Sequence, residues 1–270
     1  MIDTKKAVQS ADSLDDDFYL EEDVFSETEE VAVEDTAALA VGKKRKAELK
    51  KDKKKKKKTR QSEDPYGHMN IWTESVATQY AYVADRQKKA LPKLSTVEHE
   101  EQALVEEAFV NNEKFTSEHV LDALPNYIKF GVAAHKKLAK APTELASPVA
   151  LVITHSAVRA VDLVRALKEF NETAKVAKLF AKHMKIEEQI YYLEKQPLHL
   201  GVGTPNRIKA LVDQGHLRLD RLELVVVDTE RNAKRFNIFD NDTVRGDLFS
   251  FLGSHVADRM RKNQTKLGLF

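Results

Sequence analysis

The chain has 270 residues, of which 44 are Lys or Arg and 43 are Asp or Glu, so its formal net charge is +1. It contains no cysteine, which excludes a disulfide scaffold, a thiolate metal site and a cysteine nucleophile. No apolar run approaches the roughly 20 residues that cross a bilayer, and the first residues lack the apolar stretch of a secretory signal. We therefore expect a soluble protein of the cytosol or nucleus, built from one or two domains.

The first 42 residues carry 13 acidic and only 2 basic side chains. A segment with so few apolar residues does not bury enough surface to offset the entropy of ordering its chain. We expect residues 1–42 to form a disordered acidic tail. A second interpretation is a docking peptide, whose apolar residues at 18–20 and 24–25 enter a groove on a partner.

The next segment, residues 43–60, is Lys-rich, with 13 basic and 2 acidic residues. Such a run is typical of a nuclear localisation signal or a nucleic-acid-binding tail. Lys and Arg beside phosphates gain affinity by releasing counterions, without reading sequence. The alternative is a charge run that only keeps the chain soluble. The basic residues are Lys43, Lys44, Arg45, Lys46, Lys50, Lys51, Lys53, Lys54, Lys55, Lys56, Lys57, Lys58 and Arg60.

Residues 61–147 are predicted to be a linker followed by a helical segment. Pro65 and Gly67 mark the linker, and from Ile71 onward apolar residues recur at helical spacing. The pattern predicts four helices, one starting at 71 and the others at about 96–109, 117–124 and 130–140. Trp72 is the only tryptophan, and we expect it to be a core side chain rather than a platform for a ligand.

Residues 148–262 alternate between short apolar runs and amphipathic stretches. The pattern predicts strands at 149–154, 175–181, 198–203 and 222–229, and helices at 155–170, 186–195, 205–215 and 244–261. Such alternation is typical of βαβ units and a parallel sheet. The fold class is therefore α/β, with a single parallel sheet flanked by helices. Residues 263–270 are expected to be a C-terminal tail.

A helix start follows the third predicted strand, at Thr204, Pro205, Asn206 and Arg207. Thr suits the position that caps a helix, and Pro suits the first helical residue. The N–H groups and dipole at such a start attract anions, and an exposed Arg207 in the first turn would pair with a phosphate. The alternative is a capped helix with an exposed Arg and no ligand.

Asp228 ends the strongest predicted strand, where a Walker B carboxylate would stand. However, no glycine begins the phosphate-binding sequence G-x-x-x-x-G-K-[ST], so the chain has no Walker A motif. Without that motif Asp228 is alternatively a helix cap or a loop residue. The nine histidines show no metal-ligand spacing and no G-x-S-x-G elbow is present. We therefore expect no metal and no cofactor.

The stretch from 148 to 252 resembles the first RecA-like domain of a DEAD-box RNA helicase. Residues 204–208 are similar to the helicase motif T-P-G-R-[IL], with Asn206 in place of Gly, and 225–228 are similar to the strand that enters D-E-A-D. Thr229 stands where the motif has its water-positioning carboxylate. The resemblance implies a helicase lobe in which only Asp228 remains of the parts that phosphoryl transfer needs.

The order of an acidic segment, a Lys-rich segment, helices and one degenerate lobe resembles the Cms family. This resemblance implies a nucleolar factor of the small-subunit processome, whose partners are pre-ribosomal RNA and processome proteins, with no membrane and no ATP. We expect a non-catalytic scaffold or placeholder that contacts RNA phosphate through residues 204–207. The alternatives are a protein-interaction module with a vestigial RNA face and, least favoured, a cryptic RNA-dependent ATPase.

Overall fold

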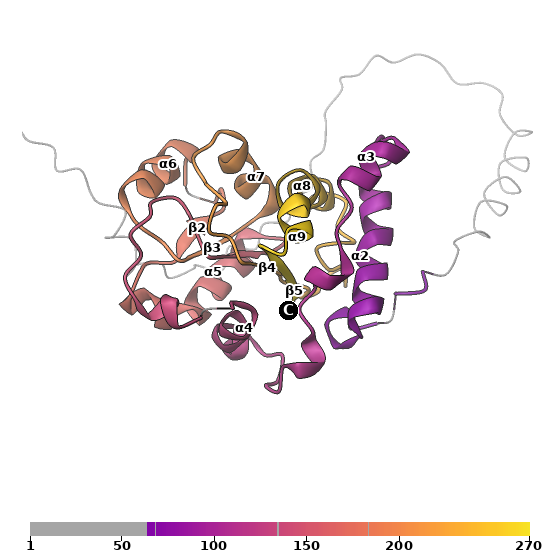
Figure 1. Ribbon diagram of the computed structural model, residues 1–270, viewed down its shortest axis with the longest axis horizontal. Coiled ribbons are helices and arrows are strands. Elements are labelled where there is room, and N and C mark those ends of the chain that lie inside the picture. The colour runs from indigo at the N-terminus through magenta and orange to yellow at the C-terminus, as the bar shows by residue number, and fades with distance from the viewer. Residues whose placement is uncertain (1–63, 68, 134, 183) are drawn as a thin grey trace, which may run out of the picture. The chain divides into compact units, whose positions relative to one another are not determined.

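Five short strands lie side by side in one parallel sheet, in the order β2-β3-β1-β4-β5 (Figure 1). In register, Val152 of β1 lies between Val202 of β3 and Val226 of β4. The computed structural model describes residues 64–67, 69–133, 135–182 and 184–270, so both charged segments at 1–60 lie outside the described residues. The strands are β1 Ala150–Ile153, β2 Ala177–Leu179, β3 Leu200–Gly203, β4 Leu224–Val227 and β5 Lys266–Leu269.

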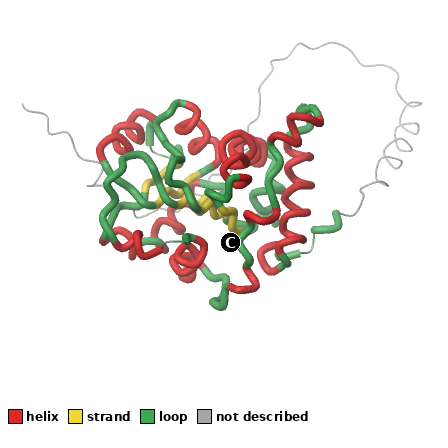
Figure 2. The backbone as a smooth tube through the Cα atoms, viewed as in Figure 1, coloured by secondary structure: helices red, strands yellow, loops and turns green. Residues whose placement is uncertain are grey.

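Helices cover both faces of this sheet, and in Figure 2 the strands lie between them. Side chains alternate along a strand, so Leu151 and Ile153 of β1 join one core, which includes Ile208 of α7, while Ala150 and Val152 join the other. All four β1 residues are fully buried, as in a central parallel strand. The helices are α2 Val76–Ala90, α3 Thr96–Glu101, α4 Leu124–Gly131, α5 Ala157–Ala166, α6 Ile186–Lys195, α7 Pro205–Asp213, α8 Arg245–Phe251 and α9 Ala257–Arg261.

The α/β fold class predicted from the sequence is confirmed, as are the four strands and the helices between them. The helix predicted at 244–261 is interrupted by a π-helical turn at Leu252–Val256. The predicted C-terminal tail is wrong, because Lys266–Leu269 forms the edge strand β5 beside β4. The glycine of this strand is Gly268. It is needed there because a Cβ would lie 2.7 Å from the Tyr127 hydroxyl oxygen.

The helices predicted between 96 and 140 are mostly misplaced. The helix α3 ends at Glu101, and Phe109 instead forms a parallel bridge with Leu267 of β5. The Val110 amide donates to the Leu267 carbonyl at 2.8 Å, so this extended segment covers the edge of β5. The helix α4 spans Leu124–Gly131, between the two predicted helices. A tertiary contact therefore overrode the helical pattern here.

The N-terminal helices pack against the rest of the fold rather than forming a separate arm, with α2 beside α8 and α4 against β4. Tyr82 of α2 is buried and its hydroxyl lies 3.2 Å from Oδ1 of Asn237. The Trp72 ring stacks on His119 with centroids 4.0 Å apart and contributes to the core, as predicted. On its other side His119 stacks on Phe270, and burial lowers its pKa to about 4, so the imidazole in this stack is neutral at physiological pH.

Candidate nucleic-acid interface

The carboxyl ends of the parallel strands meet at one edge of the sheet, which we call the carboxyl edge. In open α/β sheets ligands bind beyond this edge. Here β1 runs into Thr154, β3 into Thr204 and β4 into Asp228. The strand order places β1 between the other two, so the two sequence-predicted sites lie at the same edge, one strand apart.

The start of α7 follows β3 at this edge, and Pro205 is its first residue, as the sequence predicted. Thr204 stands at the capping position, but its side chain accepts no backbone N–H. Its Oγ1 donates instead to Oδ1 of Asn206 at 2.9 Å, so the predicted side-chain cap is wrong. Gly203 precedes it, and a Cβ there would lie 2.0 Å from the Leu179 carbonyl oxygen, which makes glycine obligatory where β2 and β3 approach.

Arg207 is half-buried, not exposed as the sequence led us to expect. Its Nη1 donates to Oε1 of Gln189 at 2.8 Å and to the Met184 carbonyl at 3.3 Å. Gln189 is buried, and its Nε2 donates to the Lys178 and Phe180 carbonyls at 2.9 and 2.8 Å. Arg207 therefore orients the amide that binds the outer edge of β2.

The charge of Arg207 is not neutralised by a direct partner. Burial lowers its pKa from the usual value, while the charge of Glu187 acts in the opposite direction. Within the described residues no carboxylate lies within 4.0 Å of its guanidinium, and only Nη1 has a hydrogen-bond partner. Because an arginine stays protonated in proteins, Nε and Nη2 remain as donors for an anion at the start of α7.

Asp228 lies at the end of β4 and is buried. One oxygen accepts from Thr154 Oγ1 at 2.8 Å and from Arg159 Nε at 3.0 Å, and the other accepts from Arg159 Nη2 at 3.1 Å. Burial by itself would lower the pKa of Arg159, but the bonds and charge of Asp228 raise it overall. Asp228 is thus the buried member of an ion pair with the half-buried Arg159, which also lies 3.9 Å from Glu230. Neither sequence interpretation contained this arrangement.

Thr229, the next residue, is also occupied. Its amide and its Oγ1 both donate to the Phe270 carbonyl, at 2.5 and 2.9 Å, which fastens the end of β4 to the end of β5. Sequence analysis missed Arg159 and Gln189, the partners of the two predicted site residues. No motif marks either of them, since each acts through a contact made only in the folded chain.

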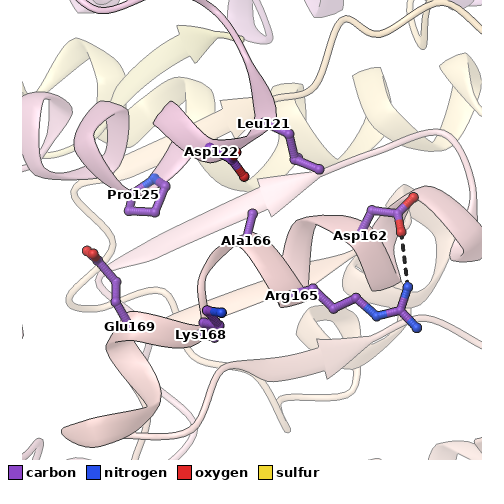
Figure 3. Close-up of a pocket in the computed structure, with 8 residues that line it drawn as sticks. All are labelled: Leu121, Asp122, Pro125, Asp162, Arg165, Ala166, Lys168 and Glu169. Atoms are coloured by element: carbon purple, nitrogen blue, oxygen red, sulfur yellow. Dashed lines mark hydrogen bonds and ion pairs between the residues drawn. The ribbon is translucent and has the colours of Figure 1, made fainter.

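A pocket of about 380 Å³ lies away from the carboxyl edge, between the turn before α4 and the end of α5 (Figure 3). Figure 3 shows Arg165 turned toward Asp162, with which it pairs at 3.4 Å. None of the predicted site residues lines this pocket, whose walls are Leu121, Asp122, Pro125, Asp162, Arg165, Ala166, Lys168 and Glu169.

Two classes of site find no support in the part of the chain that the structure describes. Its His, Asp and Glu side chains form no group of three that could hold a metal ion. None of its helices has the length and apolar character that crossing a membrane requires.

Comparison with known families gives the decisive observation. Residues 27–270 match the model of CMS1, described as a subunit of the U3-containing 90S pre-ribosomal complex. The chain belongs to the CMS1 family. The resemblance proposed from the layout of its segments is confirmed.

Individual relatives agree with this membership. Protein CMSS1 of Homo sapiens is 42% identical over 149 residues, 55% of this chain and 53% of that protein. Protein CMSS1 of Danio rerio is 36% identical over 65% of this chain and 59% of its own length. Protein CMS1 of Chaetomium thermophilum is 34% identical over 59% of this chain and 64% of its own length. The chain thus spans between half and two thirds of the relatives it matches.

A solved structure of S. cerevisiae dbp5, bound to nup159, gle1, IP6 and ADP, also aligns with this chain. It has a TM-score of 0.39 and 14% sequence identity, and covers 68% of this chain and 45% of that one.

Proposed function

We propose that this CMS1-family chain is a non-catalytic factor of small-subunit ribosome assembly. It acts in the nucleolus as a scaffold or placeholder, binding pre-ribosomal RNA together with processome proteins. Membership of the family supports the place in ribosome assembly. The absence of catalysis and the contact with RNA are supported by the side chains at the carboxyl edge.

The ion pair between Asp228 and Arg159 carries the non-catalytic part of the proposal. A carboxylate that holds Mg²⁺ for phosphoryl transfer needs free oxygens toward the metal. Both oxygens of Asp228 already accept hydrogen bonds from Arg159, whose charge also repels a second cation. Thr229 has no carboxylate with which to orient water. Both features at the carboxyl end of β4 support a chain that does not hydrolyse ATP.

We expect Mg-ATP to produce no saturable heat in isothermal titration with the full chain, up to millimolar concentration. The reason is that both oxygens of Asp228 already accept hydrogen bonds from Arg159. Titration of Mg-ADP serves as a second probe of the same position. A saturable heat with either nucleotide would contradict the non-catalytic assignment and favour the cryptic ATPase.

The contact with RNA is assigned to the start of α7, at Thr204, Pro205, Asn206 and Arg207. Asn206 is exposed. Within the described part of the chain, Nε and Nη2 of Arg207 have no hydrogen-bond partner and can donate to a ligand. A helix start with an uncompensated guanidinium favours a phosphate. A contact with phosphate positions an RNA strand but does not distinguish one base sequence from another.

Replacing Arg207 with Ala is expected to weaken RNA binding by about 1.5–3 kcal/mol, the value of a charge-assisted bond. The same change removes the bond to Gln189, so it also lowers the free energy of unfolding, by about 1–2 kcal/mol. Gln189→Met is the matched control, because it removes the internal bonds and keeps the guanidinium. Binding is measured with the full chain by fluorescence anisotropy, and stability by thermal melts.

The comparison of these two variants separates the proposal from its main alternative. If Arg207 contacts RNA, Arg207→Ala loses affinity and Gln189→Met keeps it, although both variants melt earlier. If both variants keep the RNA affinity of the unchanged chain, Arg207 only stabilises the fold through its bond to Gln189. The chain would then be a protein-interaction module with a vestigial RNA face, an alternative that the bond from Arg207 to Gln189 specifically favours.

A further inference from the structure

The chain that leaves β4 forms a loop at residues 231–236, which we call the basic loop. Its side chains are Arg231, Asn232, Ala233, Lys234, Arg235 and Phe236. It follows Asp228 by only three residues, and so it leaves the sheet from the carboxyl edge. The helicase resemblance reaches only Arg231, the last residue of the stretch 228–231 that is similar to D-E-A-D, and residues 232–236 belong to neither predicted site.

The basic loop is held in one shape by its own backbone and by Asn232. The Asn232 amide donates to the Phe236 carbonyl at 2.9 Å, and the Arg235 amide donates to the Asn232 carbonyl at 2.7 Å. The Asn232 side chain accepts from the amides of Lys234 and Phe236, at 3.0 and 3.1 Å. Arg235 adopts a φ of 64°, a conformation that non-glycine residues rarely take. The loop is thus a built turn.

Both ends of the loop are fixed to the rest of the fold. Arg231 donates through Nη2 to the Met69 carbonyl at 2.9 Å. After the loop, Asn237 is buried and donates to the Tyr82 hydroxyl of α2 at 2.8 Å. The bonds that shape the turn use backbone atoms and Asn232. They leave the side chains of Lys234, Arg235 and Phe236 exposed for other contacts.

The charge on this loop is uncompensated. Within the described residues Arg231, Lys234 and Arg235 form no ion pair with a carboxylate. The carboxylates nearest in sequence lie beside other cations. Glu230, just before the loop, is 3.9 Å from Arg159, Asp240 pairs with Arg86, and Asp242 pairs with Arg245 at 2.5 Å. Three cations on one rigid turn therefore attract a polyanion.

The aromatic side chain in the loop indicates which class of polyanion the loop would bind. The Phe236 side chain is 49% exposed, beside two cations. Cations that follow a phosphate backbone, combined with an aromatic ring on which a base stacks, are the elements of single-stranded nucleic-acid binding. The strand order places the end of β4 two strands from the end of β3, about 10 Å at the usual spacing, and the loop continues beyond β4 toward Met69 and α2. A strand of several nucleotides is therefore needed to reach from the start of α7 to the basic loop.

We propose that the basic loop is a second docking surface for single-stranded RNA, with a base stacked on Phe236 and phosphates held by Lys234 and Arg235. The proposal rests on the proposed function, which makes RNA the ligand of the carboxyl edge. It adds a place and a mode of contact, since stacking on an aromatic ring tolerates any base. The strand would run along the carboxyl edge, past Arg207 at one end and Phe236 at the other.

Ultraviolet crosslinking of the full chain to an oligouridylate, followed by mass spectrometry, tests the location. Salt is raised to about 300 mM to weaken contacts made by charge alone. A uridine adduct on Phe236 or its neighbours in the loop supports the proposal. Adducts confined to residues 43–60 or 204–207 overturn the loop contact while leaving the proposed function standing. The absence of any adduct counts against both.

Affinity measurements on variants test the mode of contact. Phe236→Ala and the double variant Lys234→Glu/Arg235→Glu are each expected to weaken oligouridylate binding about tenfold, with unchanged melting temperatures. The controls are Tyr191→Ala, an aromatic residue 66% exposed on α6, and Lys88→Glu, an exposed cation on α2. Controls that lose as much affinity as the loop variants overturn the proposal.

An acidic peptide is the competing ligand for such a loop, and the chain's own residues 12–35 supply one with many carboxylates. The same variants are therefore titrated with that peptide added in trans. If the loop variants keep their RNA affinity but lose the peptide, the surface binds acidic protein segments and the RNA assignment falls.

Discussion

Replacing Asp228 with Ala is expected to lower the free energy of unfolding by about 3–5 kcal/mol, measured by urea denaturation. The substitution removes the three hydrogen bonds of a buried carboxylate, and it leaves Thr154 without its acceptor and the half-buried Arg159 with only Glu230, 3.9 Å away. Hydrogen bonds to a charged group contribute about 1.5–3 kcal/mol each, so the loss of the buried acceptor is strongly destabilising. The large effect would mark Asp228 as a structural residue of the carboxyl edge.

Asp258→Ala is the matched control, since this carboxylate pairs with Lys262 on the exposed surface. That change is expected to leave the free energy of unfolding nearly unchanged, because solvent screens an exposed ion pair. A double variant, Asp228→Leu with Arg159→Leu, should recover much of the stability that Asp228→Leu loses. If Asp228→Ala is as mild as the control, the ion pair is weak, and the carboxylate is free to serve another ligand.

The sheet and its helices were predictable because their signals are local. The continuous apolar run at 224–227 indicates a buried strand, and the helical spacing of apolar residues at 186–195 indicates a helix. Each forms the expected element. The segment from 96 to 140 failed for the opposite reason. The residues before Phe109 have the apolar spacing of a helix, but Phe109 forms a bridge with Leu267, which is far away along the chain. The edge strand β5 was missed for the same reason.

In the candidate site, too, local features were predictable from the sequence and long-range contacts were not. Pro205 at the start of α7 follows from residue type alone. The roles of Arg207 and Asp228 depend on Gln189 and Arg159, which lie 18 and 69 residues away in sequence. Burial of an Arg or Asp therefore depends on tertiary partners that no spacing rule identifies. The basic loop was overlooked because its cations and its aromatic residue form no motif, and only the turn at Asn232 brings them together.

Deleting residues 43–60 is expected to weaken binding of single-stranded RNA about 100- to 1000-fold at low salt. The segment has 13 basic residues in 18 and lies outside the described residues. Each phosphate contact on a single strand steepens the fall of log affinity with log salt by about 0.7, so the deletion should also flatten that slope. The measurement is a salt titration of RNA affinity with the full chain and with the chain that lacks residues 43–60.

Deleting residues 18–35 is the control, because it removes the same length of chain from the acidic segment instead. It should leave the salt slope unchanged or steeper, since it removes carboxylates that repel RNA or compete for the same cations. The lysine-rich segment also resembles a nuclear localisation signal, so the deletion should move a fluorescent fusion out of the nucleus. A deletion that keeps both the slope and the nuclear signal would mean that residues 43–60 only solubilise the chain. RNA affinity would then come from the carboxyl edge, where Arg207 and the basic loop would have to supply the salt dependence.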